Sequence, residues 1–398
     1  MIKLAQRVQA VKPSPTLSLN AKAKALAAKG VDVVSFAAGE PDFDTPAFVK
    51  ESAKRALDAG FTKYTASAGI PELRAAICDK LQKDNALGYT PEQVLVSCGA
   101  KHSLYNIFQA LLSPGDEVVI FAPYWVSYPD MVRLADGVPV IVETRPEEGY
   151  VPDPTRLKNA LTSRTRAVVL NSPSNPTGAS LDKKALQSIA EAVAGHDCLL
   201  ITDDIYEKLL YTAAPFCNIA KAQPSLFART VVVNGLSKAY AMTGWRVGYA
   251  AGPKELIAAM QLIQDQSTSN VTSFVQKAAV TALQGPTDEL QTMVKAFKER
   301  RALLVNGLNK LPGVTCPMPD GAFYVFPDVR GLLGKRHQGI EVSGSLKLSE
   351  ILLDDYQLAA VPGLPFGAEG FLRLSFAASR ETIEKGLQRL QAFVSALT

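Results

Sequence analysis

The stretch Asn234-Gly-Leu-Ser-Lys-Ala-Tyr-Ala-Met-Thr-Gly-Trp-Arg-Val-Gly-Tyr249 follows Val231–Val233, an apolar run that is typical of a buried strand. Lys238 therefore comes shortly after a strand, among small and aromatic residues rather than on a polar helix face. Burial disfavours the charged form of lysine, so we expect a lowered pKa and a free amine that can condense with a carbonyl. The alternative interpretation is a lysine that pairs with a carboxylate near a loop.

An arginine follows this lysine eight positions later, at Arg246, and indicates an anion held nearby. A lysine that condenses with an aldehyde, beside an arginine that holds a phosphate, is the combination that pyridoxal 5'-phosphate (PLP) requires. The turn Cys98–Lys101 also separates a predicted strand from a predicted helix. Its small residues Gly99 and Ala100 would let a phosphate approach the first amides of that helix, although such turns are common in α/β proteins.

Two further polar residues follow predicted strands. Asp203 comes after Cys198–Thr202, where a partly desolvated carboxylate needs a cationic partner, and a protonated pyridine nitrogen is such a partner. The adjacent Asp204 would point to the other side because side chains alternate along a strand. Asn175 lies in Asn171–Gly178, a loop that two prolines and a glycine make rigid. We therefore expect Asp203 and Asn175 at one binding site, with an aspartate that only caps a turn as the alternative.

Two other segments contribute an aromatic ring and a second arginine. Trp125 lies in the polar segment Pro123–Tyr128 and is positioned to stack on a pyridine ring, although core packing is an equal alternative. Arg373 alternates with apolar neighbours in Phe371–Phe376. That pattern fits either a clamp for a carboxylate or a surface arginine on an edge strand.

The composition limits the class of protein. The chain has 398 residues, 47% of them hydrophobic, and a formal net charge of +4, and it carries no basic run that would indicate nucleic-acid binding. Five cysteines without CxxC spacing and three histidines argue against a disulfide framework and against a metal site. No apolar stretch reaches the length of a membrane span, and we expect a soluble, cytoplasmic protein.

Strand-like and helical stretches alternate from Pro46 to about Gly285, which predicts an α/β fold with a mostly parallel sheet covered on both faces. Ligands in such sheets bind beyond the carboxyl ends of the strands. We expect an N-terminal arm at 1–12, a large domain at 46–287, and a smaller α/β domain formed by 13–45 together with 288–398. The stretch Gly334–Gly339 is predicted to be a mobile loop.

The segments around Gly39, Gly99, Asn175, Asp203, Lys238 and Arg373 occur in the order seen in class I aminotransferases, and the chain resembles that family from Lys12 to Arg373. The likeness is to the bacterial aspartate aminotransferase branch. It implies the fold-type I PLP-transferase fold, PLP as cofactor, and ping-pong transamination through a Schiff base on Lys238. It also implies a homodimer with shared active sites.

The resemblance assigns roles residue by residue. The cofactor-binding residues that it implies are Tyr64, Gly99, Ala100, Lys101, Trp125, Asn175, Asp203, Tyr206, Ser237, Lys238 and Arg246. The substrate-binding residues that it implies are Lys12, Gly39, Lys101, Trp125, Asn175 and Arg373. Some relatives carry a phosphate-binding serine at the position of Gly235, so a hydroxyl contact here must come from Ser237 or be missing.

Within that family, Lys101 lies where this branch places the lysine for a distal carboxylate, and Lys12 offers a second cation. The resemblance therefore implies an aspartate:2-oxoglutarate aminotransferase. The same fold also carries prephenate, glutamate and other aminotransferases as well as β-lyases, which remain alternatives.

Overall fold

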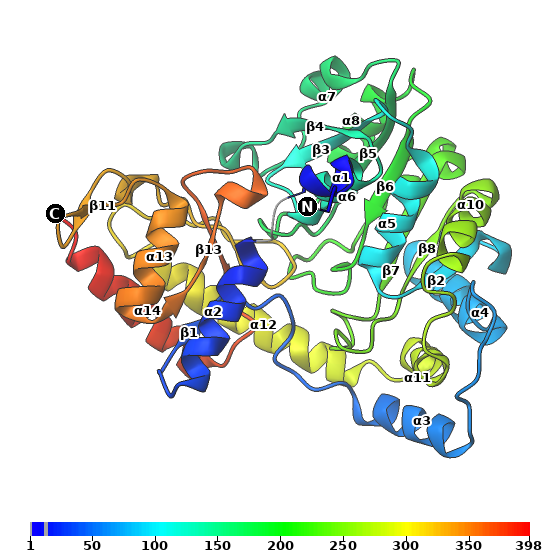
Figure 1. Cartoon of the computed structure of the whole chain (residues 1–398), viewed down its shortest axis with the longest axis horizontal. Helices are drawn as coiled ribbons and strands as arrows, with labels where there is room; N and C mark the ends of the chain where they lie inside the picture. Colours follow the sequence, from blue (N-terminus) through cyan, green and yellow to red (C-terminus); the bar gives the residue numbers. More distant parts are fainter. Residues whose placement is uncertain (1, 12–14) are drawn as a thin grey trace.

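The computed structural model describes residues 2–11 and 15–398, and its largest element is a seven-stranded sheet (Figure 1). The strand order is β2-β8-β7-β6-β5-β3-β4, and β8 alone runs antiparallel to its two neighbours. The strands are β2 (Val94–Ser97), β3 (Glu117–Ala122), β4 (Val138–Glu143), β5 (Thr165–Asn171), β6 (Leu199–Asp203), β7 (Thr230–Gly235) and β8 (Gly248–Ala251). The predicted mostly parallel sheet is confirmed.

The apolar runs of these strands are continuous because both faces of the sheet are covered. In β3, Val118 and Ile120 pack into a core with α5, α6 and α10, whereas Val119 packs into a separate core with α8. The helices of this region are α3 (Ala47–Asp58), α4 (Pro71–Lys80), α5 (Ala100–Leu111), α6 (Ser127–Leu134), α7 (Pro154–Ala160), α8 (Lys183–Ala192), α9 (Ile219–Ala222), α10 (Lys254–Asp265) and α11 (Ser273–Gln284).

A second region follows the long helix α12 (Asp288–Leu308) and contains a three-stranded antiparallel sheet in the order β13-β14-β9. N-terminal residues join it: β1 pairs in parallel with β12, and α2 lies beside this group in Figure 1. The remaining elements of this region are α2 (Pro15–Ala28), β1 (Val34–Ser35), β9 (Tyr324–Val325), α13 (Ser345–Tyr356), β12 (Leu358–Ala359), β13 (Val361–Pro362), β14 (Leu372–Ser375) and α14 (Arg380–Ser395). This pairing agrees with the expected membership of 13–45, while the domain limits themselves stay predictions.

The structure adds detail to two local predictions. Gly334–Gly339, predicted to be a mobile loop, includes β10 (Arg336–His337), which pairs with β11 (Ile340–Glu341) as a hairpin around Gln338 and Gly339, while its mobility stays a prediction. The amphipathic pattern of Pro71–Lys83 predicts one helix, but α4 ends at Lys80 and a π-helical turn, η1 (Leu81–Asn85), continues it.

Short elements complete the description. The helix α1 (Gln6–Gln9) contacts α6. Short 3-10 helices are η2 (Pro91–Gln93), η3 (Pro146–Glu148), η4 (Pro224–Arg229), η5 (Arg330–Leu332) and η6 (Leu364–Phe366). No helix in the described ranges is both long enough and apolar enough to cross a bilayer. The described residues also contain no cluster of three or more potential metal ligands.

Candidate active site

A cavity of about 440 Å³ opens where β5, β6 and β7 end. That is the edge of a parallel sheet at which ligands bind. Eleven of the predicted site residues line it: Gly39, Ala100, Lys101, Trp125, Asn175, Asp203, Tyr206, Ser237, Lys238, Arg246 and Arg373. The fold thus brings together segments that are separated by more than 300 positions in the sequence.

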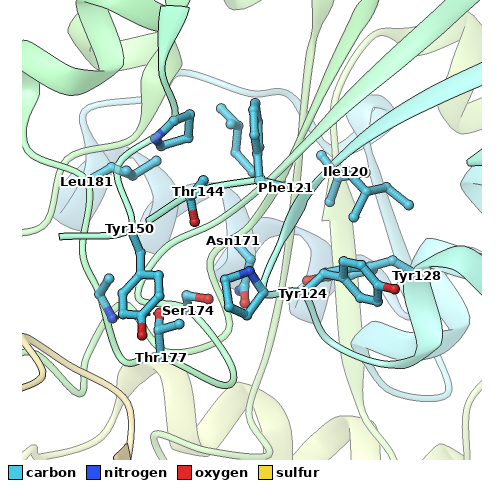
Figure 2. Close-up of a pocket in the computed structure, with 15 residues that line it drawn as sticks. Ile120, Phe121, Tyr124, Tyr128, Thr144, Tyr150, Asn171, Ser174, Thr177 and Leu181 are labelled. Carbon is cyan, nitrogen blue, oxygen red and sulfur yellow. Dashed lines mark hydrogen bonds between the residues drawn. The ribbon is translucent and has the colours of Figure 1, made fainter. Parts of the chain in front are cut away.

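A second, much smaller cavity lies between Tyr124, Tyr128, Asn171 and Tyr150 (Figure 2). Its volume of about 40 Å³ leaves room for water but not for an amino acid or a cofactor. Tyr128 and Asn171 line both cavities and form part of the wall between them. Of these two cavities, only the larger therefore has the size of a ligand site.

Lys238 follows β7 by three residues and opens onto the larger cavity. Its Nζ donates a hydrogen bond to the carbonyl of Gly39 and lies 5.9 Å from the centre of the Tyr206 ring. Burial lowers the pKa of Lys238 to about 8, with Glu40 opposing and Arg373 and Arg246 adding to the shift. A larger fraction of this lysine than of an ordinary one is therefore uncharged near neutral pH.

Asp203 is the last residue of β6 and is 4% exposed. Its Oδ2 accepts a hydrogen bond of 2.6 Å from the hydroxyl of Tyr128, and its Oδ1 accepts one of 3.3 Å from the amide of Ile205. Burial raises the pKa of Asp203 to about 6, and the Tyr128 bond opposes that shift. Because a buried carboxylate is costly without a charged partner, a cation that binds beside Asp203 would stabilise its charged form.

The neighbouring Asp204 points the other way, as the alternation of the strand predicts. Its Oδ2 accepts a bond of 2.6 Å from Asn218, and the residue does not line the larger cavity. Tyr128 was not predicted from the sequence. It lies at the start of α6, 75 positions from Asp203, and no local pattern links the two residues.

An anion cradle forms where β2 turns into α5. Gly99 has a φ of +88°, and a Cβ on it would lie 2.6 Å from Nη2 of Arg246, so the guanidinium packs directly on the glycine. Arg246 donates to the carbonyls of Thr243 (3.0 Å) and Cys98 (3.2 Å). The first amides of α5 and the guanidinium of Arg246 can therefore both contact one bound anion. Ser237, 8% exposed, lines the same cavity.

Arg373 lies on β14, the central strand of the small sheet, and is 3% exposed, so the alternative of a surface arginine on an edge strand is excluded. It donates to Oδ1 of Asn175 (3.2 Å) and to the carbonyl of Ala37 (3.1 Å), and its Nε has no partner. The guanidinium lies 4.5 Å from the ring centre of Tyr324.

Tyr324 is a further lining residue that the sequence did not reveal. Its hydroxyl lies 3.1 Å from the hydroxyl of Tyr206, and a Cβ on Gly39 would lie 3.5 Å from the same atom. Tyr324 thereby links the small sheet to the segment after Asp203. It belongs to a two-residue strand, β9, whose length gives no pattern to detect.

Lys101 and Trp125 lie close together in the lining of the larger cavity. Nζ of Lys101 lies 4.9 Å from the ring centre of Trp125. Partial burial, followed by the charge on Arg246, lowers the pKa of Lys101. Tyr64 is 93% exposed and does not reach the cavity of its own chain. Lys12 falls outside the described residues.

The charges around the cavity are unbalanced. Lys101, Lys238, Arg246 and Arg373 all line it, and none of them forms an ion pair with any of the residues that the structure describes. The only carboxylates in that lining are Glu40 and Asp203. Four cations without ion-pair partners around a cavity of this size form a receptor for an anionic ligand.

Comparison with known proteins identifies the family of the chain. The family profile described as Aminotransferase class I and II matches residues 31–390. The aspartate/prephenate aminotransferase of Cereibacter sphaeroides is 49% identical over all of both chains. The aspartate aminotransferase of Geobacillus stearothermophilus is 45% identical, over 99% of this chain and 100% of its own.

Solved structures give the same result. The crystal structure of the aspartate aminotransferase from Rhizobium meliloti superposes with a TM-score of 0.97 at 43% identity, with full coverage of both chains. An aspartate aminotransferase structure from Thermus thermophilus with maleate superposes with a TM-score of 0.92 at 46% identity, over 99% of this chain and 100% of that one. On sequence and fold together, the chain belongs to the class I and II aminotransferases.

Proposed function

We propose that this aminotransferase uses PLP to exchange the amino group between aspartate and 2-oxoglutarate. The observation that carries the proposal is a set of four cations around one cavity that form no ion pair with any carboxylate among the described residues. PLP and a dicarboxylic amino acid together bring three anionic groups: one phosphate and two carboxylates. Arg246, Arg373 and Lys101 provide one cation for each, and Lys238 remains for the chemistry.

The residues present fit the cofactor that the family implies. The cradle of Gly99, Ala100 and Arg246 suits a phosphate, because it combines the free amides at the start of a helix with a guanidinium. Only a glycine at position 99 allows this, since a Cβ there would collide with Arg246. Asp203 is buried, has no cation in contact, and has a pKa raised to about 6 by that burial. A ring nitrogen placed beside it would stay protonated and would hold the aspartate charged. Trp125 and Tyr206 supply the flanking aromatic side chains.

When bound, PLP supplies an aldehyde that condenses with amino groups and a ring that accepts an electron pair. The chain supplies the proton transfers. Nζ of Lys238, once free, would take the proton from Cα of the amino acid and return it to the former aldehyde carbon of the cofactor, across the linking nitrogen. Its pKa of about 8 suits both roles near neutral pH. The buried carboxylate of Asp203 would keep a proton on the ring nitrogen, and Tyr128 orients that carboxylate.

The two substrate carboxylates would bind at opposite ends of the cavity. Arg373, with its unpartnered Nε and its bond to Asn175, suits a planar contact to the α-carboxylate. Lys101 suits the distal carboxylate. The Thermus thermophilus structure was solved with maleate, which is itself a dicarboxylate, and this supports the assignment.

Prephenate is the second candidate substrate, because the Cereibacter relative is named an aspartate/prephenate aminotransferase. A wider cavity of about 1250 Å³ shares Lys101 and Arg246 with the site and reaches Val11, the residue before Lys12. That space supports a role for Lys12 toward the second carboxylate of a larger substrate.

We further propose a homodimer in which Tyr64 serves the cofactor phosphate of the partner subunit. Tyr64 is 93% exposed and does not line the cavity of its own chain, so its hydroxyl is free to contact a second copy. We expect the enzyme to act in the cytoplasm, where its five unpaired cysteines would stay reduced.

The test is a panel of initial rates for amino acids and 2-oxo acids, including prephenate, together with pyruvate release from a cysteine conjugate. Aspartate with 2-oxoglutarate should give the highest kcat/KM. A preference for neutral amino acids would contradict the aspartate assignment, and rapid pyruvate release without transamination would favour a β-lyase.

A further inference from the structure

Behind the active site lies a buried polar cluster made of Lys80, Asn85, Glu207 and Asn234. All four residues are at most 8% exposed. None of them lines the cavity, and the chemistry proposed above does not use them. Buried charges carry a large desolvation cost unless they are paired and hydrogen-bonded, so the arrangement of this cluster needs an explanation.

Glu207 is the centre of the cluster and accepts three hydrogen bonds. Its Oε1 accepts from Nζ of Lys80 and from Nδ2 of Asn234 (2.9 Å). Its Oε2 accepts from Nδ2 of Asn85 (2.7 Å). The carboxylate is therefore satisfied on both oxygens and fixed in orientation.

The π-helical turn η1 explains how one helix supplies two of these donors. Lys80 precedes the turn and Asn85 ends it, five positions later, and Nζ of Lys80 donates to Oδ1 of Asn85 (2.7 Å). Positions i and i+5 are neighbours in a π-helix but not in an α-helix. The irregular turn thus aims both side chains at Glu207.

Glu207 also connects two segments that carry active-site residues. It follows Tyr206 directly and lies four residues after Asp203. Its partner Asn234 lies at the end of β7, four residues before Lys238. Oδ1 of Asn234 accepts from the amide of Gly235 (2.7 Å), so the same side chain that binds Glu207 also fixes the start of the turn that leads to Lys238.

We propose that Glu207 is a positioning residue of this aminotransferase: held by Lys80 and Asn85, it fixes the Lys238 turn, through Asn234, relative to the strand end that carries Asp203. The inference rests on the function proposed above. The alternative is a buried ion pair that only stabilises the fold. The two alternatives predict different results when the link through Asn234 is cut. A pair that only stabilises the fold predicts unchanged catalysis, whereas a positioning role predicts a lower kcat.

The decisive variant is Asn234→Ser in the PLP-loaded full-length chain. Serine keeps an acceptor for the Gly235 amide but is too short to reach Glu207, so the Lys80–Glu207 pair survives while its link to the turn is cut. We expect kcat to fall roughly tenfold to a hundredfold, because small displacements of a catalytic group cost rates of this order. KM for the amino acid should change by less than about threefold.

Glu207→Gln is the second variant, and Glu117→Gln is the matched control. Glu117 is as buried as Glu207 and is held by Arg164 and Thr162, but it lies at the opposite end of the sheet. Glu207→Gln should lower kcat, and Glu117→Gln should leave it unchanged. The double variant Asn234→Ser/Glu207→Gln should lose no more activity than the less active of its two parents, because both act through one link.

A spectroscopic measurement gives a readout other than activity. The pH midpoint of the visible absorbance change of the PLP-loaded protein depends on the distance between Lys238 and the charge of Asp203. It should move by about half a pH unit or more in Asn234→Ser and stay constant in Glu117→Gln.

The outcomes separate the two proposals. A wild-type protein without a visible band and without transamination would overturn the proposed function. An active wild type in which Asn234→Ser matches Glu117→Gln in kcat and in absorbance midpoint would overturn the positioning role alone. The mild Asn234→Ser substitution keeps the test decisive if Glu207→Gln does not fold.

Discussion

The two ends of the large sheet treat charge in opposite ways. At the amino end of β3, Glu117 accepts 2.6 Å bonds from Arg164 and from Thr162, and Asp116 pairs with Arg166 at 2.9 Å. At the carboxyl ends of β5, β6 and β7, the partners found among the described residues are uncharged: Nζ of Lys238 donates to a carbonyl, and the carboxylate of Asp203 accepts from a tyrosine and an amide.

The difference separates charges that stabilise the fold from charges that are available to bind a ligand. A charge that is already paired gains little from a ligand and mainly stabilises the structure. A charge that is desolvated and unpaired raises the free energy of the empty site, and a complementary ligand recovers that cost. Shifted pKa values follow the same division, because Lys238 and Asp203 move toward their uncharged forms. Substitutions of the unpaired charges that line the cavity at the carboxyl end should therefore affect catalysis, and substitutions of the paired charges at the amino end should not.

The largest effect is expected for Lys238→Ala, which removes the amine that we propose binds PLP and moves the substrate proton. Transamination should fall by at least roughly three orders of magnitude, the range attributed to acid–base catalysis. Borohydride reduction of the wild type should abolish the visible band and leave a pyridoxyl label on the peptide that contains Lys238. A label on Lys101 instead would break the assignment.

Asp203→Asn should have the next largest effect, because a neutral amide cannot keep a ring nitrogen protonated. We expect kcat to fall by roughly a thousandfold, as for removal of a preorganised electrostatic group. The control is Asp204→Asn. Asp204 does not line the cavity and its Oδ2 accepts a hydrogen bond from Asn218, so its replacement does not touch the site and kcat should change little. Equal losses in the two variants would mean that the wrong carboxylate has been chosen.

The sequence could predict the features of this contrast that depend on residues close together in the chain, but not those that depend on contacts between distant residues. Lys238, Asp203 and Asn175 could be found because each follows an apolar run, and the ends of parallel strands meet at one edge. The side of the sheet was predictable too, since alternation separates Asp203 from Asp204. The burial of Arg373 was not, because its pattern of alternation is equally that of an edge strand.

The residues that sequence reasoning missed act through long-range or irregular contacts. Tyr128 meets Asp203 only after α6 has packed on the sheet, and Tyr324 meets Tyr206 across 118 positions. The π-helical turn after Lys80 has no local signature, because the amphipathic pattern simply continues. Tertiary packing determines these two contacts and the π-helical turn, and it cannot be inferred from local propensity.

Lys101→Ser tests substrate choice with a smaller expected effect. Losing a charge-assisted contact to a desolvated carboxylate costs about 1.5–3 kcal/mol, or roughly tenfold to a hundredfold in kcat/KM. The loss should appear for aspartate and glutamate and be much weaker for alanine and phenylalanine. Cofactor affinity should largely survive, because the backbone amide of residue 101 remains. Equal losses on acidic and neutral substrates would limit Lys101 to a role at the phosphate.

The smallest effect is expected at the amino end, for Arg166→Ala. Arg166 pairs with Asp116, but its side chain is 53% exposed, and exposed pairs contribute at most about 1 kcal/mol to the free energy of unfolding. Asp116 also keeps the amide of Ser113 as a donor at 2.8 Å, so the substitution leaves no buried carboxylate without a partner. We therefore expect a slightly lower thermal midpoint, with kcat, KM and the visible absorbance unchanged. Initial rates with aspartate and 2-oxoglutarate, measured well below that midpoint, check the expectation. A clear fall in kcat would show that charge at the amino end reaches the chemistry through the strands, and the division between the two ends of the sheet would not hold.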